Sequence, residues 1–288
     1  MLKTFFFIPA NNERFLEKRN SIEADNFVFD LEDAVAKNET IACLERLNRL
    51  ELRDNYYVRP RVDFDEERKP NLKPLTDLID IGFRKFIIPK FSELDELKQM
   101  QKLLMSISKY SFYEFQFILL VENPLCLLNL NEIVTSKILN ITGITLGSHD
   151  YTNAIGMKHT PYYLYFARNY VLNVAKAFNL ISIDIASMNI SDRDEFSNEC
   201  LDAFNMGYDS KFILHPRQLE ILRTTAYFTP EEVKSAKEVY NTVKSIEESK
   251  FSVVKVNGKL YEKPHLDRIM KIVEWSKNNA LLSDIRLN

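Results

Sequence analysis

The chain has 288 residues, of which 45% are hydrophobic and 27% are charged, so it carries enough apolar material for a large core and lacks the composition of a disordered protein. Its formal charge is -3, and its Lys and Arg residues are dispersed, which argues against a nucleic-acid partner. Six glycines are present, and their positions allow neither a dinucleotide-binding fingerprint nor a phosphate-binding loop.

The N-terminal apolar run at residues 5–8 ends at Pro9 and is followed by charged residues, so we interpret it as a first strand rather than a signal peptide. No stretch approaches the roughly 18 apolar residues of a membrane span, and we expect no membrane partner. The odd number of cysteines, without a C-x-x-C pair, indicates neither a disulfide framework nor a zinc site. A reducing cytoplasm is the expected location.

Eight short apolar runs alternate with longer segments of helical periodicity, the pattern of β-α units on a parallel sheet. Each run is nearly continuous, as expected of strands buried on both faces. Eight such strands predict an α/β fold with a closed (β/α)8 barrel. The runs cover residues 5–8, 27–30, 56–61, 85–89, 115–122, 144–147, 180–184 and 211–215.

Between the strands, helices are predicted from about Glu93 to Ile107 and from Tyr162 to Phe178. The second helix has a clear start, because Thr160 supplies a capping hydroxyl and Pro161 suits the first helical position. The aromatic residues near that start are expected to form a packing face of the helix. They are Tyr162, Tyr163, Tyr165 and Phe166.

After the eighth strand the pattern changes, and we divide the chain into a barrel at residues 1–216 and an extension at residues 217–288. The extension is predicted to contain a helix at 229–249, a hairpin turning at Asn257-Gly258, and a helix at 264–277. Asn-Gly between alternating residues is the strongest short-range hairpin signal. In a barrel enzyme, such an extension serves as a lid over the mouth or as an arm to a neighbouring subunit.

Active sites of barrel enzymes lie at the C-terminal ends of the strands. In this sequence an ionisable or amide side chain is found at or just after the end of every predicted strand. In chain order these are Asn11, Asn12 and Arg14; Asp30, Glu32 and Asp33; Arg59 and Arg61; Lys90; Glu122; His149 and Asp150; Asp184; and His215.

Carboxylates from several strands that converge on one mouth repel one another unless a cation neutralises them. Oxygen ligands without nearby cysteine and with few histidines favour Mg2+ or Mn2+ over Zn2+. Arginines on the opposite side would bind a substrate carboxylate through their planar guanidinium groups. The strand ends therefore predict a divalent metal site that acts on a small carboxylic acid.

Several motifs also carry a resemblance to a known family. FIPANNERF, VFDLEDAV, YVRPR, IIPK, LLVENP, LGSHDY and ILHPRQ occur in this order and spacing. Together they resemble the citrate lyase β-subunit-like group of the HpcH/HpaI aldolase and citrate lyase family, over residues 4–270. The resemblance implies a Mg2+-dependent carbon-carbon lyase or aldolase that works through a metal-stabilised enolate. The implied substrate is a hydroxy or keto acid, in many members as a β-hydroxyacyl-CoA of the citryl, malyl or citramalyl type.

The resemblance also implies roles for individual residues. Glu122 and Asp150 would be direct metal ligands, and Glu32 and Asp33 would hold metal-bound waters. Arg59 would bind the substrate carboxylate or keto acid, with Arg61 as the alternative because RPR aligns in two registers.

Two further residues have implied roles near the substrate. Arg14 resembles an arginine of the first loop that lies near substrate. Glu262 of LYEKP occupies the place of a lid acid, commonly Asp, that reaches into a neighbouring subunit's site. The implied assembly is therefore a homo-oligomer, with a trimer as the favoured form.

The sequence departs from the family pattern where Ala10 replaces the glycine of P-G-N and Ile185-Ala186 replaces the glycine of I-D-G. A Cβ at each mouth loop would narrow or reshape the substrate pocket. Lys90 is interpreted as a packing or carboxylate-pairing residue rather than a Schiff-base lysine. His149 and His215 are interpreted as structural or peripheral.

Two alternative functions remain open from the sequence. The first is a binding subunit that has kept the metal motif without turnover. The second is a metal-dependent aldolase for a phosphorylated or other non-CoA keto acid. Mg2+ binding and metal-dependent activity, measured together in Glu122→Gln, would separate the binding subunit from a lyase. CoA thioesters compared with free hydroxy acids would separate the two substrate classes.

Overall fold

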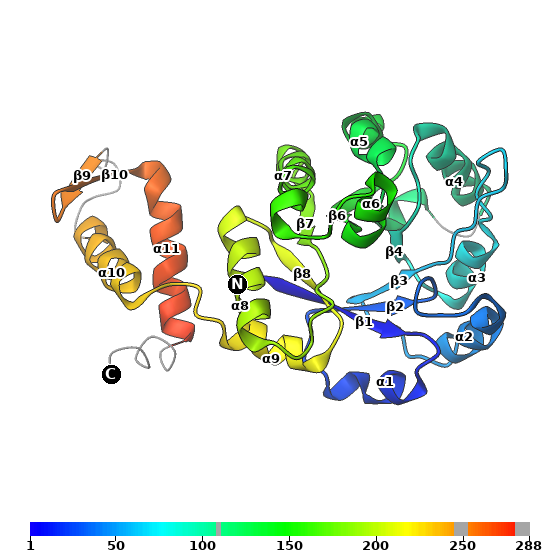
Figure 1. Ribbon diagram of the computed structural model, residues 1–288, viewed down its shortest axis with the longest axis horizontal. Coiled ribbons are helices and arrows are strands. Elements are labelled where there is room, and N and C mark those ends of the chain that lie inside the picture. Colours follow the sequence, from blue (N-terminus) through cyan, green and yellow to red (C-terminus); the bar gives the residue numbers. More distant parts are fainter. Residues whose placement is uncertain (108–110, 245–252, 280–288) are drawn as a thin grey trace. The chain divides into compact units, whose positions relative to one another are not determined.

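A computed structural model of the protein describes residues 1–107, 111–244 and 253–279. Its centre is a closed barrel of eight parallel strands, in which each strand pairs with the next in sequence and β8 pairs with β1 (Figure 1). The predicted (β/α)8 barrel is thus confirmed. The strands are β1 Lys3–Pro9, β2 Asn26–Asp30, β3 Tyr56–Arg59, β4 Lys85–Ile88, β5 Gln116–Val121, β6 Ile141–Leu146, β7 Ile181–Asp184 and β8 Ser210–Ile213.

Helices surround the barrel, in the connections between strands and after β8 (Figure 1). They are α1 Glu13–Lys18, α2 Thr40–Leu47, α3 Lys73–Ile81, α4 Leu94–Ser106, α5 Pro124–Ser136, α6 Ser148–Ile155, α7 Pro161–Ala177, α8 Arg193–Met206 and α9 Pro216–Thr224, with short 3-10 turns at Arg19–Ser21, Lys37–Glu39 and Phe112–Glu114. The connection from β6 to β7 carries two helices where the sequence predicted one. The additional helix, α6, ends at Gly156, whose φ of 75° is one that glycine adopts readily.

Alternate residues of the strands fill the barrel interior, as the two-residue period of a strand requires. This core contains Phe5, Val28, Tyr57, Ile87, Ile118, Leu120, Ile183 and Phe212. Asp184 and Lys211 are adjacent in sequence to two of these residues and therefore face the helices. There, Oδ2 of Asp184 accepts a hydrogen bond from Nζ of Lys211 at 2.9 Å, and Oδ1 accepts one from Nε of Arg168 at 3.0 Å. Asp184, expected at the mouth, instead joins the barrel wall to α7.

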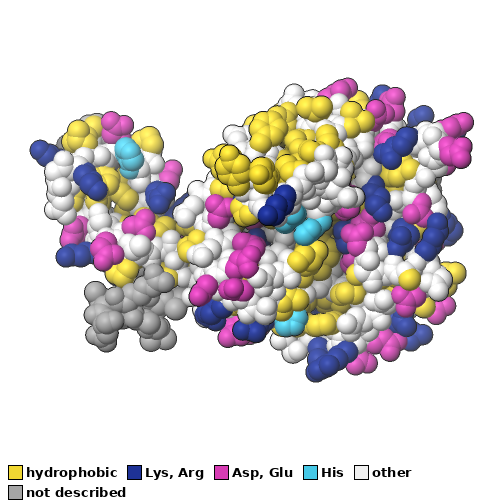
Figure 2. Space-filling view, viewed as in Figure 1, with side chains coloured by type: hydrophobic (Ala, Val, Ile, Leu, Met, Phe, Trp, Pro, Cys, Tyr) yellow, Lys and Arg dark blue, Asp and Glu magenta, His cyan; other side chains and the backbone are white. Residues whose placement is uncertain are grey.

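The aromatic residues at the start of α7 do not pack as expected. The buried face of the helix is made by residues such as Leu164, Ala167 and Val171, which lie at helical spacing on the other side. Hydrophobic side chains accordingly gather on the surface over α7 in Figure 2. The exposed fractions are 83% for Tyr162, 52% for Tyr163, 61% for Tyr165 and 68% for Phe166.

The chain forms two compact units, residues 2–222 and residues 223–288 with Met1. The second unit contains α10 Pro230–Lys244, β9 Val253–Val256, β10 Lys259–Glu262 and α11 Lys263–Asn278. The predicted hairpin is confirmed, and Asn257 and Gly258 take φ values of 48° and 80°, as a tight type I′ turn demands. Residues 245–249, predicted to continue the helix, lie outside the described residues. Among the described helices, none is long and apolar enough to cross a membrane.

Candidate functional site

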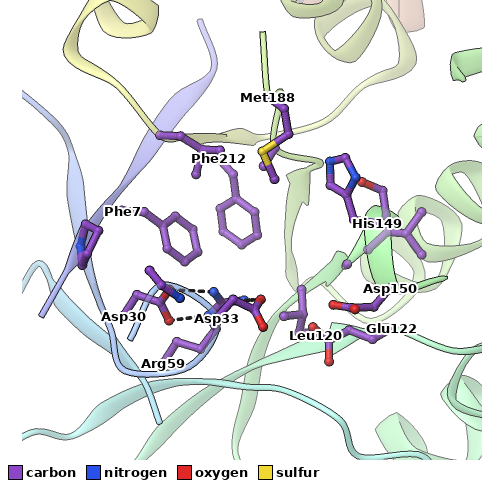
Figure 3. A pocket seen from close by; sticks show the side chains of 17 residues that line it. Phe7, Asp30, Asp33, Arg59, Leu120, Glu122, His149, Asp150, Met188 and Phe212 are labelled. Carbon is purple, nitrogen blue, oxygen red and sulfur yellow. Dashed lines mark hydrogen bonds and ion pairs between the residues drawn. The ribbon is translucent and has the colours of Figure 1, made fainter. Parts of the chain in front are cut away.

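A cavity of about 330 Å³ opens at the C-terminal ends of the strands. One side of it carries carboxylates, and the other carries the rings of Phe7 and Phe212 (Figure 3). Its lining comes from seven of the eight strands and the loops that follow them. The residues are Phe7, Pro9, Asp30, Asp33, Ala34, Arg59, Leu120, Glu122, Leu146, Gly147, Ser148, His149, Asp150, Ala186, Met188, Phe212 and Leu214.

Arg59, the last residue of β3, is held by carboxylates of the loop after β2. Its Nε and Nη2 each donate to Asp30 at 2.7 Å, and its Nη1 lies 3.1 Å from both Glu32 and Asp33. Burial lowers the pKa of Arg59, but the charges of these carboxylates outweigh it and raise the pKa above its ordinary value. Asp30 is also buried and accepts hydrogen bonds from the backbone N–H groups of Glu32 and Ala34, so it shapes the loop as well as the arginine.

Glu32 is 1% exposed and lies between two cations. Its Oε1 is 2.6 Å from Nζ of Lys90 and its Oε2 is 3.1 Å from Arg59, yet neither oxygen accepts a hydrogen bond of good geometry. Burial raises the pKa of Glu32, and the two cations oppose this rise. For Lys90, burial acts to lower the pKa, but Glu32 dominates and the pKa is raised, which keeps the amine charged. The predicted carboxylate-pairing role of Lys90 is confirmed.

Glu122 follows β5 directly and is only 4% exposed. Its Oε2 accepts a hydrogen bond of 2.8 Å from the backbone N–H of Lys90, which takes a left-handed φ of 66°. Gly147 makes room for this side chain, since a Cβ there would lie 2.5 Å from Cγ of Glu122. Burial, followed by the charges of Glu32 and Asp150, raises the pKa of Glu122 to about 8.

Asp150 stands in the first turn of α6, on the same side of the cavity as Glu122 (Figure 3). It is exposed, whereas Ser148 at the start of the same helix is buried and bonds to Nε2 of His159 at 3.0 Å. The rings of His149 and His159 stack at 4.1 Å, with burial and then the charge of His149 lowering the pKa of His159. His149 therefore lies at the rim of the cavity.

Three of the residues assigned roles by resemblance do not line the cavity, namely Arg14, Arg61 and the buried Glu32. Arg61 turns away from it, and its Nη2 donates to the backbone carbonyls of Glu32 and Val35. Arg14 is exposed on α1 and does not line the cavity. Glu262 belongs to the second unit, where it is the exposed last residue of β10 and its backbone N–H donates to Nδ1 of His265 at 3.0 Å.

The donor set of the cavity fits a hard divalent cation held by few protein ligands. Within the described part of the chain, no three His, Cys, Asp or Glu side chains stand close enough to enclose a metal on their own. Glu122 and Asp150 nevertheless share one side of the cavity, and the charge of Asp150 contributes to the raised pKa of Glu122. Mg2+ is typically bound by one or two carboxylates, with water and substrate oxygens completing its shell. Of the two residues expected to hold metal-bound waters, Asp33 lines the cavity, whereas Glu32 is buried behind it with its oxygens facing Lys90 and Arg59.

Some contributors to the site were not anticipated from the sequence. The roles of Gly147 in admitting Glu122 and of the Lys90 backbone in holding it depend on side-chain packing and a left-handed backbone. The apolar side formed by Phe7 and Phe212 was also missed, although their alternation with outward residues in strands that end at the mouth is a usable signal.

A closed parallel barrel with ionisable side chains grouped at the C-terminal ends of its strands defines a protein of the TIM-barrel enzyme class. The model of the HpcH/HpaI aldolase/citrate lyase family matches residues 3–216, and the chain belongs to this family.

Curated relatives extend over nearly the whole chain. The citrate lyase subunit beta of Haemophilus influenzae is 26% identical over 96% of this chain and 97% of its own. The (3S)-malyl-CoA thioesterase of Cereibacter sphaeroides is 27% identical over 92% of this chain and 90% of its own. Among solved structures, CitE from Mycobacterium tuberculosis in complex with magnesium, acetoacetate and coenzyme A has a TM-score of 0.78 at 19% identity, covering 96% of this chain and 98% of that one. That structural likeness supports the fold.

Proposed function

We propose that the protein is a Mg2+-dependent carbon-carbon lyase or aldolase that acts on a small β-hydroxy acid or its CoA thioester. The observation that carries the proposal is the pairing of Glu122 and Asp150 at one side of the mouth cavity, with the pKa of Glu122 raised to about 8 by burial and by neighbouring carboxylates. Such a group is costly to ionise without a cation. The relative named citrate lyase subunit beta supports the same reaction class.

The proposed metal ligands are Glu122 and Asp150, with Glu32 and Asp33 binding the metal's water ligands. When bound, Mg2+ acts as a Lewis acid that stabilises the negative charge developing on the substrate oxygen. Solved structures of CitE from Mycobacterium tuberculosis in complex with magnesium, at 19% and 21% identity to this chain, are consistent with this choice. Mn2+ has the same preference for oxygen ligands and is expected to substitute.

In the cleavage direction, the β-hydroxyl gives its proton to solvent water at the cavity mouth and becomes the carbonyl of a keto acid as the carbon-carbon bond breaks. The electron pair of that bond forms the enolate of the second fragment, which then takes a proton at carbon. We assign this proton to the carboxyl of Glu262, supplied by a neighbouring copy of the chain in a homo-oligomer. Arg59 is the preferred contact for the substrate's acid group, because it lines the cavity and Arg61 does not.

The test uses the purified full-length protein with Mg2+, β-hydroxyacyl-CoA thioesters and the matching free hydroxy acids. We expect metal-dependent release of a keto acid together with acetyl-CoA, and loss of that release with EDTA or in Asp150→Asn. Asp202→Asn is a matched control, because Asp202 is a half-exposed carboxylate that pairs with Arg168 away from this cavity. A protein that binds no divalent cation would refute the lyase proposal.

Thioester hydrolysis is the second candidate, and the malyl-CoA thioesterase relative at 27% identity is what favours it. The same assay separates the two reactions. Hydrolysis yields free CoA thiol and an intact hydroxy acid, whereas cleavage yields a keto acid and leaves the thioester bond in acetyl-CoA. A non-CoA aldolase would instead turn over the free or phosphorylated acids, and a silent binding subunit would bind Mg2+ without any product.

A further inference from the structure

The mouth cavity has two unlike sides. Phe7 and Phe212 meet edge to face with ring centroids 4.9 Å apart, and both line the cavity. The carboxylates of the cavity are on the other side (Figure 3). An extended substrate held at Glu122 and Asp150 would therefore contact aromatic and aliphatic side chains with its remaining part.

The positively charged side chain that lines the cavity is already paired with carboxylates of the protein. Arg59 is the one Lys or Arg among the lining residues of the described chain, and all three of its guanidinium nitrogens contact carboxylates at 2.7 to 3.1 Å. Arg61, the other candidate, donates to backbone carbonyls instead. One arginine shared among Asp30, Glu32 and Asp33 has little capacity to balance a second anionic group on a substrate.

The charge balance remains negative with a metal in place. The lining holds the carboxyl groups of Asp30, Asp33, Glu122 and Asp150 against the single guanidinium of Arg59. When all four are ionised, a divalent cation leaves a net charge of about -1 before the substrate's own carboxylate arrives. A further carboxylate would meet repulsion from the acidic side and desolvation on the apolar side.

We infer that the 2-oxo acid portion of the substrate carries an uncharged, apolar substituent that packs on Phe7 and Phe212, and that the cavity discriminates against a second carboxylate on it. This inference rests on the proposed function, since it assumes that the 2-oxo acid group lies at Glu122 and Asp150. The specificity would come from two features. The apolar side of the cavity favours an uncharged substituent, and Arg59 is already paired with carboxylates of the protein.

The test compares two five-carbon probes, 2-oxopentanoate and 2-oxoglutarate, which differ by a terminal methyl against a terminal carboxylate. Binding to the full-length protein is measured by calorimetry with saturating Mg2+, with pyruvate as a reference. We expect 2-oxopentanoate to bind at least about tenfold more tightly than 2-oxoglutarate, because one alkyl contact is gained and one charge repulsion is avoided. Equal affinities, or a preference for 2-oxoglutarate, would overturn the inference.

Met188 offers a second measurement, because it lines the cavity and is 63% exposed, so a long polar side chain fits without burial. Met188→Arg adds a cation that is not paired with a carboxylate, so the ratio of the affinity for 2-oxopentanoate to that for 2-oxoglutarate should fall about tenfold. The uncharged variant Met188→Gln should keep the wild-type ratio. An unchanged preference in Met188→Arg counts against charge as the cause. If no 2-oxo acid, pyruvate included, binds in a Mg2+-dependent way, the proposed function itself fails. If pyruvate binds but the dicarboxylate is preferred, the specificity inference alone fails.

Discussion

Glu122 offers a direct test of the electrostatics of the site through the variant Glu122→Gln. The side chain is 4% exposed, and burial together with the charges of Glu32 and Asp150 raises its pKa to about 8 from an ordinary value of 4.5. Glutamine has nearly the shape of the protonated carboxyl and carries no charge. The substitution therefore removes a titrating group from a place where its ionised form is unfavourable.

The magnitude follows from linkage between protonation and folding. Because the folded-state pKa is above the unfolded one, the stability contribution is fully present below pH 4.5 and is lost as the pH rises toward 8. Each pH unit above 4.5 costs about 1.4 kcal/mol. At pH 7 the metal-free protein is therefore less stable, by about 3 kcal/mol, than it would be if the pKa of Glu122 were the same in the folded and unfolded states. Glu122→Gln should thus be more stable than the metal-free wild type by about that amount at pH 7, and equal to it near pH 4.5. For a domain of this size the difference corresponds to roughly 6 to 12 °C in Tm.

The assay is thermal unfolding at pH 4.5, 6 and 7, with EDTA and with Mg2+. Mg2+ should raise the Tm of the wild type and leave Glu122→Gln unchanged. Glu96→Gln is the matched control, because Glu96 is equally buried but accepts hydrogen bonds of 2.7 Å from Arg68 and from the backbone of Ser92, so its loss should destabilise the protein. A metal-free Glu122→Gln that is less stable than wild type at pH 7 would refute the reasoning.

Three further predictions follow. The apparent Mg2+ affinity, measured by calorimetry, should rise about tenfold per pH unit up to pH 8, because binding must release the proton of Glu122; an affinity independent of pH between 6 and 8 would contradict this. Asp30→Asn should cost about 3 kcal/mol in chemical denaturation, because it breaks the buried pair with Arg59, whereas Asp33→Asn, whose side chain is 58% exposed, should cost under about 1 kcal/mol; similar costs would argue against the burial difference. Gly147→Ala should displace Glu122 and abolish Mg2+ binding while the fold persists by circular dichroism; retention of wild-type affinity would show that the site tolerates the Cβ.

The sequence alone predicted the barrel, because eight nearly continuous apolar runs separated by helical segments have few other stable arrangements. The same reasoning located Glu122 and Asp150 at neighbouring strand ends, and the structure places both at one cavity. Asp184 was misplaced, since being at a strand end does not tell which way a side chain points; its neighbour Ile183 faces the core, so Asp184 faces α7.

The directions in which side chains point settled two questions that the sequence left open. Arg59 and Arg61 align equally well in RPR, yet only Arg59 lines the cavity, because the pleat of β3 turns it toward Asp30 while Arg61 lies beyond the strand and bonds to backbone carbonyls. The aromatic cluster of α7 was expected to pack, but its residues belong to the face opposite Leu164 and Val171.

Periodicity and local motifs were enough to specify the order of the strands, the acidic character of their C-terminal ends and the family. How those charges combine depends on the folded arrangement. Whether a carboxylate is stabilised by an arginine, as Asp30 is, or destabilised by its own neighbours, as Glu122 is, depends on burial and on distances between residues far apart in the chain. Electrostatic interactions in a low-dielectric interior change steeply over a few ångströms, and sequence spacing contains no such distances.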